Sequence, residues 1–347
     1  MERRTYRHLH TNFDEAMGKG TGYFRQIENY TGRNRQHFRF FRELYQKNNF
    51  LNSEPREEPR IPKILHQIWI GPREIPEELC RFQKTWLDLH PDWEYCLWTN
   101  DSVQELEFTD PILKELFDRP LTLGERTDIL RYEILYQFGG VYSDLDCECL
   151  RPLDPLVESF DFFGGIFHPM FATTNRAIFL NNCLLGAKPH HPVIAKISSI
   201  MRENWDNLDH AGDEFYTTIQ RTLAVLTEAT IREAGQDGHR DVALPPTYLF
   251  PVVPYPLLDK MIRGPIDSLL GIFNPKKAPY SHAYDYSFAL HHSHKEWMVD
   301  LYSTVTFNHE GWAAFSVRDW LRFLKSQFNR DTERKIARQT FEEFLAG

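Results

Sequence analysis

The sequence predicts an α/β fold, in which helices cover the faces of an open β-sheet. Short apolar segments typical of buried strands alternate with helical segments from residue 61 onward, and one strong helix leads through two glycines directly into an apolar strand. A chain of 347 residues with 41% hydrophobic and 26% charged residues has the composition of a globular protein with a large core. We expect a helical extension over residues 1–58, the α/β domain over 59–300, and helices packed on it over 301–347.

The expected elements follow in chain order. The first 50 residues carry an apolar rhythm of three to four, as Phe38, Phe41 and Leu44 show, and this spacing predicts helices. The charged, proline-flanked segment 53–60 is typical of a linker. Strands are expected at residues 64–70, 93–98, 141–146 and 160–167, and helices at 76–90, 124–138, 192–205, 214–235, 317–328 and 331–345.

Local signals mark some element boundaries. Residues 100–102, Asn-Asp-Ser, are suited to cap the helix that follows the second strand. Gly139 stands where a left-handed glycine commonly ends a helix. The segment 240–295 is rich in proline, aromatic residues and histidine, so we expect irregular backbone there.

The distribution of charge indicates which classes of molecule the protein could bind. A net charge of −9 argues against nucleic acid, because phosphate binding needs a basic surface. The first 60 residues carry 12 Lys and Arg against 8 Asp and Glu, a local excess of +4. This arm is either a solvated helical extension or a site of peripheral contact with an anionic membrane. Aromatic residues make up 14% of the chain, which suits a large core and also suits sugar-binding surfaces.

No targeting signal or membrane span is expected. The first residues carry charges but no following apolar stretch, and no segment approaches the roughly 20 apolar residues that a membrane span needs. The five cysteines show neither metal-ligand nor redox spacing, so we expect buried free thiols in a reducing compartment. The expected location is the cytoplasm, or a host cell into which the protein is delivered as an effector. The cysteines are Cys80, Cys96, Cys147, Cys149 and Cys183.

Two carboxylates, Asp144 and Asp146, stand at the end of the third expected strand. Strand alternation predicts that they share one face with Glu148, at the carboxyl end of the strand, where α/β sheets bind ligands. Asp128 and Arg131 lie three apart on the preceding helix and so share a helix face. Two carboxylates at this spacing suit a hard cation such as Mg²⁺ or Mn²⁺, which neutralises charge on a departing diphosphate.

The stretch from Glu125 to Asp146 resembles the DXD sugar-binding region of the family 32 retaining glycosyltransferases, which includes yeast initiating α-1,6-mannosyltransferase. It is more distantly similar to the glucosylating domain of the large clostridial toxins. Residues 61–72, 182–192 and 289–297 resemble three further segments of the family, in the same order. The resemblance covers residues 61–300 and implies a GT-A (Rossmann-like) fold and a UDP-sugar or GDP-sugar donor.

The resemblance also implies roles for individual residues. Trp69 matches a tryptophan that stacks on the nucleotide base, and His291 a histidine that completes the metal or diphosphate site. Asp146 is expected to bind the metal directly, whereas Asp144 divides its contacts between metal and donor. The expected catalytic residues are Asp144, Asp146 and Asn182; the metal ligands are Asp144, Asp146 and His291; the donor-binding residues are Gln67, Trp69, Asp128, Arg131, Gly140, Tyr142, Asp144, His292 and Trp297.

Three functions remain open from the sequence. The first is a retaining, metal-dependent transfer of a sugar to a glycan, lipid or small acceptor, with no enzyme nucleophile. The second is a toxin-like effector that glycosylates a host protein, which the basic helical arm favours. The third is an inactive nucleotide-sugar-binding protein, which the intact acidic pair argues against. The clustered histidines also permit a zinc site, although no Cys/His spacing supports it.

Overall fold

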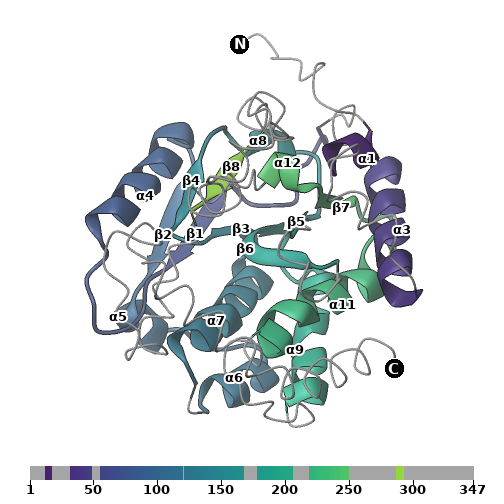
Figure 1. Cartoon of the computed structure of the whole chain (residues 1–347). Coiled ribbons are helices and arrows are strands. Elements are labelled where there is room, and N and C mark those ends of the chain that lie inside the picture. Colours follow the sequence, from purple (N-terminus) through teal and green to yellow (C-terminus); the bar gives the residue numbers. More distant parts are fainter. Residues whose placement is uncertain are drawn as a thin grey trace, which may run out of the picture.

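The computed structural model describes residues 12–17, 32–48, 55–119, 121–167, 178–205, 219–249 and 287–292. Its centre is a six-stranded sheet with the order β2-β1-β3-β6-β5-β7 (Figure 1). Only β6 in this sheet runs antiparallel to its neighbours. The strands are β1 (Ile64–Ile68), β2 (Glu94–Trp98), β3 (Gly140–Ser143), β5 (Phe162–Ile166), β6 (Leu180–Ala187) and β7 (Asp241–Leu244).

Helices lie on both faces of this sheet, which confirms the α/β prediction. In Figure 1, α7, α9 and α11 cover one face, and α4 lies on the other side with a small second sheet of β4 (Cys147–Cys149) and β8 (Ala289–His291). A mostly parallel sheet, with the acidic pair after a central strand, agrees with the expected GT-A architecture. The helices are α1 (Phe13–Ala16), α3 (Gly32–Lys47), α4 (Glu77–Leu89), α5 (Asn100–Gln104), α6 (Pro111–Phe117), α7 (Leu123–Phe138), α8 (Asp154–Val157), α9 (Pro192–Trp205), the π-helix η2 (Ile219–Leu223), α11 (Ala224–Glu233) and α12 (Pro246–Leu249).

The expected elements that fall within the described residues form, with their ends shifted by a few residues. The largest difference at an element end concerns the third strand, which stops at Ser143 instead of continuing through the acidic pair. Four strands, β4, β6, β7 and β8, lie where the sequence predicts none, and β7, α12 and β8 contradict the expectation of irregular backbone over 240–295. The helices expected at 317–328 and 331–345 lie outside the described residues.

Helix α7 and strand β3 form the support of the site. Thr122 and Glu125 cap the start of α7 reciprocally, and its apolar stripe packs into the core. Gly139 ends the helix with φ 64° and ψ −152°, which corrects the expected left-handed cap because ψ has the wrong sign. A Cβ on Gly140, whose φ is 88°, would lie 2.6 Å from the Ile64 oxygen. The two glycines therefore allow a sharp reversal that brings β3 against β1.

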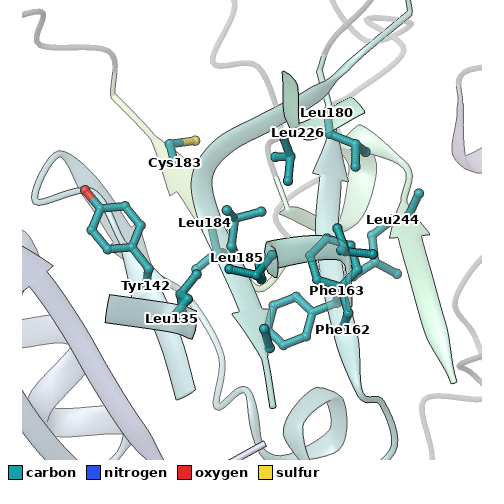
Figure 2. Packing of buried hydrophobic residues seen from close by; sticks show 14 of the residues in the cluster. Leu135, Tyr142, Phe162, Phe163, Leu180, Cys183, Leu184, Leu185, Leu226 and Leu244 are labelled. Carbon is teal, nitrogen blue, oxygen red and sulfur yellow. The ribbon is translucent and has the colours of Figure 1, made fainter. Parts of the chain in front are cut away.

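The core on both sides of the sheet is continuous. Figure 2 shows Leu135 and Tyr142 near Leu184 and Leu185, with Phe162 and Phe163 further along the same cluster. β6 supplies much of this core because all eight of its residues are buried. A strand buried on both faces shows no alternation of apolar and polar residues, and the two asparagines of β6 further obscure its apolar character.

The N-terminal helix α3 belongs to the same core. Phe38, Phe41, Leu44 and Tyr45 are buried, and the helix packs against the edge strand β7. The Tyr45 hydroxyl donates to the Tyr248 hydroxyl at 3.2 Å. The helical extension is thus attached to the sheet through apolar packing, while the expected boundary at residue 58 stays a prediction.

Two smaller expectations need correction. Thr99, and not residues 100–102, is the N-cap of α5, because the Ser102 hydroxyl accepts the Thr99 N–H at 2.7 Å. All five cysteines are free, but Cys80 is exposed and Cys96 is half-buried, so only three are buried thiols. Among the described helices, none is both long and apolar enough to span a membrane.

Candidate active site at the end of strand β3

The acidic pair lies in the turn that joins β3 to β4. Asp144, Leu145 and Asp146 follow the last residue of β3, and the Asp144 N–H donates to the Cys183 oxygen at 2.8 Å. Strand alternation is therefore the wrong reason for the shared face of the two carboxylates. The turn produces the same result: Leu145 is buried, whereas the Asp144 and Asp146 side chains are 26% and 16% exposed.

Leu145 anchors this turn in a small apolar cluster. It packs with Leu79 and Phe82 of α4, and the half-buried Trp69 ring lies against the same cluster. The Trp69 indole N–H donates to the Arg73 oxygen at 2.7 Å, which fixes the ring orientation. The tryptophan expected to stack on a nucleotide base therefore lies beside the acidic turn.

Arg131 of α7 connects the other expected donor-binding residues. Its guanidinium lies 2.8 Å from Asp128 Oδ1 and 3.2 Å from Asp144 Oδ1. It also donates to the backbone oxygen of Asn182 at 2.7 Å. Its Cζ lies 4.4 Å from the centroid of the Tyr142 ring. Only 5% of the Arg131 side chain is exposed, so these partners compensate a buried charge. The arginine thereby joins α7, β3 and β6 beside the acidic turn.

Asp144 is the most constrained member of the pair. The Tyr142 hydroxyl donates to its Oδ1 at 2.6 Å. Burial raises the pKa of Asp144 and the neighbouring Asp146 carboxylate adds to the rise, although Arg131 opposes it. Ionising both carboxylates is therefore costly unless further positive charge is close by.

His291 supplies a third ligand-type group from a distant part of the chain. Pairing of β8 with β4 sets His291 opposite Cys147, and its Nε2 lies 3.1 Å from Asp146 Oδ1. Burial alone would lower the pKa of His291, but Asp146, Cys147 and Asp144 together raise it to about 10. One ligand atom each from Asp144, Asp146 and His291 lie within 4.8 Å of one another. Two carboxylates and an imidazole suit Mn²⁺ well and Mg²⁺ less well, because Mg²⁺ prefers oxygen ligands.

A second group of ligand-type side chains, at the opposite edge of the sheet, has a structural role. His191, His239 and Asp241 also bring ligand atoms within 4.8 Å of one another. However, His191 Nδ1 accepts the Val193 N–H at 3.2 Å, so its Nε2 must carry the proton that faces Asp241 at 3.0 Å. A ring committed in this way has no lone pair left for a cation.

A third group consists of Cys147, Cys183 and His291. Burial raises the pKa of Cys183 well above its usual value, which disfavours the thiolate that zinc requires. Among the described residues, the set formed by Asp144, Asp146 and His291 is therefore the best cation site.

The remaining expected residues support the turn from behind or lie elsewhere. Gln67 is fully buried, accepts from the Tyr95 hydroxyl at 3.0 Å and reaches the Asp144 backbone oxygen at 3.5 Å. The His292 ring stacks on Phe82 at 4.1 Å and lies 2.9 Å from Glu148. These contacts, with the His292 N–H that donates to the Asp146 backbone oxygen at 2.9 Å, hold β8 against β4 and α4, and the expected donor contact of His292 stays a prediction. Trp297 lies outside the described residues.

Two residues of the site are missing from the sequence-based expectation. Tyr132 and Thr222 contact the group around Asp128: the Thr222 hydroxyl donates to Asp128 Oδ2, and the Asn182 amide lies 3.4 Å from the Tyr132 hydroxyl. Tyr132 is adjacent to Arg131, so it could be found within the same motif. Thr222 is 94 residues from Asp128, and no local pattern marks it.

Comparison with known families identifies the segment that carries this geometry. Residues 76–163 match the family described as "Glycosyltransferase sugar-binding region containing DXD motif". This segment of the chain is similar to a DXD-type glycosyltransferase sugar-binding region. This region holds α4, α7, β3 and the acidic turn, and the site extends beyond it to Asn182, Thr222 and His291.

Part of this chain is also similar in sequence to proteins named as mannosyltransferases. The chain is 39% identical to inositol phosphoceramide mannosyltransferase 3 of Schizosaccharomyces pombe over 40% of its own length and 36% of that protein. It is 33% identical to the initiation-specific alpha-1,6-mannosyltransferase of Saccharomyces cerevisiae over 27% of its own length and 21% of that protein. The chain thus matches well under half of the length of these relatives.

A solved structure titled PaToxG Glycosyltransferase is similar with a TM-score of 0.40 and 15% sequence identity, over 74% of this chain and 97% of that one.

Proposed function

We propose that this chain is a glycosyltransferase that moves a sugar, in the first instance mannose, from a nucleotide-sugar donor to an acceptor hydroxyl with the help of a divalent cation. The observation that carries this proposal is the meeting of Asp144, Asp146 and His291 at the DXD turn. The turn lies in the matched sugar-binding region, and mannose is proposed because the similar proteins are named as mannosyltransferases.

The residues at the turn fit a cation. Asp146 and His291 are its most direct ligands, since they lie 3.1 Å apart and Asp144 is already held by Tyr142 and Arg131. With its pKa raised to about 10, His291 carries a proton at neutral pH, and a cation held by this ring would have to displace that proton. The chemistry that Mn²⁺ or Mg²⁺ supplies at such a site is neutralisation of charge on a departing diphosphate.

The chain's own residues orient the donor in this proposal. The fixed Trp69 ring offers a face to the nucleotide base. The family resemblance assigns the sugar and nucleoside hydroxyls to the Arg131–Asp128 pair, whose side chains are 5% and 13% exposed beside the acidic turn. Positioning of this kind supplies much of the rate enhancement in group transfer. Retention of the anomeric configuration, with the acceptor approaching beside the leaving phosphate, follows from the family resemblance and requires no enzyme nucleophile.

The acceptor is proposed from the relatives' names. Inositol phosphoceramide mannosyltransferase 3 is named for an inositol-containing sphingolipid, so the headgroup of such a lipid is the first acceptor to test. A glycan or a protein acceptor is the alternative. Mass spectrometry of lipid extracts and of proteins, after incubation with a labelled sugar donor, separates these acceptors.

The test is donor turnover in the presence of Mn²⁺ or Mg²⁺ with a panel of UDP-sugars and GDP-sugars that begins with GDP-mannose. We expect nucleoside diphosphate release to fall by roughly 100-fold or more in Asp146→Ala, the size typical of losing one stabilising group for a developing charge. Asp88→Asn is the matched control, because Asp88 is exposed and pairs only with Lys84 on α4.

A second measurement follows the cation directly. Titration with Mn²⁺ should show one site in the wild type and in Asp88→Asn, with much weaker binding in Asp146→Ala. Absence of donor turnover under every cation and donor, together with absence of Mn²⁺ binding to the wild type, would overturn the proposal.

A further inference from the structure

Four residues, through three side chains and both the side chain and backbone of Thr222, form a closed ring of hydrogen bonds behind the proposed donor site. The Tyr132 hydroxyl donates to the Thr222 backbone oxygen at 2.7 Å, and the Thr222 hydroxyl donates to Asp128 Oδ2. Asp128 Oδ1 accepts from the Asn182 amide at 2.9 Å, and the same amide nitrogen lies 3.4 Å from the Tyr132 hydroxyl. We call this set of four residues the Asp128 ring; it joins α7, β6 and the π-helix η2.

Each donor in the Asp128 ring has a defined direction. The single proton of the Tyr132 hydroxyl is directed at the Thr222 oxygen, so the tyrosine oxygen is free to accept from Asn182. The Thr222 proton is directed at Asp128, which matches an ionised carboxylate paired with Arg131 at 2.8 Å. Burial raises the pKa of Asp128, whereas Arg131 and the hydrogen bonds from Thr222 and Asn182 oppose the rise; the ring therefore favours the charged form of Asp128 and holds the carboxylate in one orientation.

Thr222 occupies a special place in the backbone. It lies in η2 (Ile219–Leu223), and π-helical turns are rare and are frequently found at functional sites. The neighbouring Arg221 joins this turn to two helices: its NH1 lies 3.3 Å from Glu125 of α7, and its Cζ lies 4.8 Å from the centroid of the Trp205 ring of α9. The Thr222 side chain is fully buried, so it cannot touch a substrate.

The consequence of the ring reaches the acidic turn. Asp128 Oδ1 faces Arg131 and Asn182, so the hydroxyl of Thr222 is what directs the other oxygen, Oδ2. Arg131 in turn lies 3.2 Å from Asp144. Without the Thr222 hydroxyl, Asp128 Oδ2 loses its hydrogen-bond donor and the carboxylate can rotate. The Arg131 guanidinium, which pairs with Asp128 Oδ1, is then held less firmly toward Asp144.

We infer that Thr222 is a positioning residue for sugar transfer, which acts through Asp128 and Arg131 on the donor side of the DXD turn. This inference rests on the proposed function for its effect on turnover. The ring itself does not depend on that function and is testable without it.

The first test compares three variants in the donor assay. Thr222→Val keeps the side-chain shape and removes the hydroxyl, Thr222→Ser restores the hydroxyl, and Thr230→Val is the control. Thr230 is equally buried, and its hydroxyl donates to the Leu226 oxygen at 2.7 Å within α11, away from the ring. We expect kcat/KM for the donor to fall by roughly 10- to 100-fold in Thr222→Val, the range for a hydrogen bond to a charged group, and to recover in Thr222→Ser.

The second test uses no activity. A double-mutant cycle of Thr222→Val and Asp128→Ala in denaturant unfolding should be non-additive, because each substitution by itself already breaks the hydrogen bond between Thr222 and Asp128. The cycle of Thr230→Val and Asp128→Ala should be additive.

The outcomes separate the two proposals. Wild-type kcat/KM in Thr222→Val, an equal loss in Thr230→Val, or no recovery in Thr222→Ser would overturn the positioning role. An additive cycle would overturn the ring. If the wild type turns over no donor while the cycle is non-additive, the proposed function fails and the ring stands.

Discussion

Acid should destabilise this protein through His66, a buried histidine beneath the turn from α7 to β3. Only 1% of its surface is exposed. The Trp98 indole N–H donates to Nδ1 at 3.2 Å, so the proton of the neutral ring lies on Nε2, which faces the Gly139 oxygen at 3.0 Å. Protonation would direct a second N–H at the Trp98 N–H, where no acceptor is present.

The size of the effect follows from the pKa of His66, which burial lowers from 6.5 to about 4. Because the folded-state pKa lies below the unfolded value, the unfolded chain binds a proton first as the pH falls. The free energy of unfolding that depends on a neutral His66 is fully present above about pH 6.5. It is lost progressively as the pH falls to about 4. The whole gap corresponds to about 3 kcal/mol, and about 2 kcal/mol of this is lost by pH 5.

The assay is urea unfolding of the wild type and of His66→Gln at pH 7.5 and pH 5. Gln keeps a donor for the Gly139 oxygen and does not titrate. Other buried histidines also destabilise the protein in acid. One is His37, whose pKa burial lowers to about 4. The informative quantity is therefore the difference between the two proteins: the drop from pH 7.5 to pH 5 should be about 2 kcal/mol larger in the wild type. Equal drops in both proteins would refute a neutral His66 in the folded state.

Two further substitutions test the supports of the acidic turn. Tyr142→Phe keeps the ring beneath the Arg131 guanidinium but removes the 2.6 Å hydrogen bond to Asp144. Donor turnover should therefore fall roughly 10- to 100-fold with little change in Tm. Unchanged turnover would exclude a role for this hydroxyl. Gly140→Ala should cost more than about 2 kcal/mol of unfolding free energy, because φ is 88° and the new Cβ would meet the Ile64 oxygen at 2.6 Å. Gly238→Ala is its control, since Gly238 also has positive φ but open space around it; an equal loss in both variants would show that the contact with β1 is unimportant.

The parts of the fold that the sequence predicts well are those with a strong local pattern. Helices α4 and α9 carry clear apolar stripes, and β1 and β2 are short apolar runs next to breakers or caps. Helix α7 is found through its caps and apolar residues, although it is buried all round over 129–135 and Phe138 is exposed. Strand β6 is missed because burial on both faces removes alternation, and its Asn181 and Asn182 interrupt the apolar run. β8 is missed because a strand of three residues is defined by its partner β4 and not by its own sequence.

The candidate site divides in the same way. Asp128, Arg131, Tyr142, Asp144 and Asp146 lie within one continuous stretch, so a motif is enough to find them. The geometry corrects the reason for their shared face, since a turn and the burial of Leu145 replace strand alternation. His292 was expected to bind the donor; its ring stacks on Phe82, which packs with Leu145 of the acidic turn, and the donor contact stays a prediction.

The sequence by itself determines the α/β class, the central helix and strand, and the acidic pair, because each depends on residues close together in the chain. Only the tertiary structure decides which distant groups join them. Pairing of β8 with β4 brings His291 to Asp146, and the packing of η2 on α7 brings Thr222 to Asp128. These contacts arise from packing between elements that are far apart along the chain, and a spacing rule within one element carries no information about them.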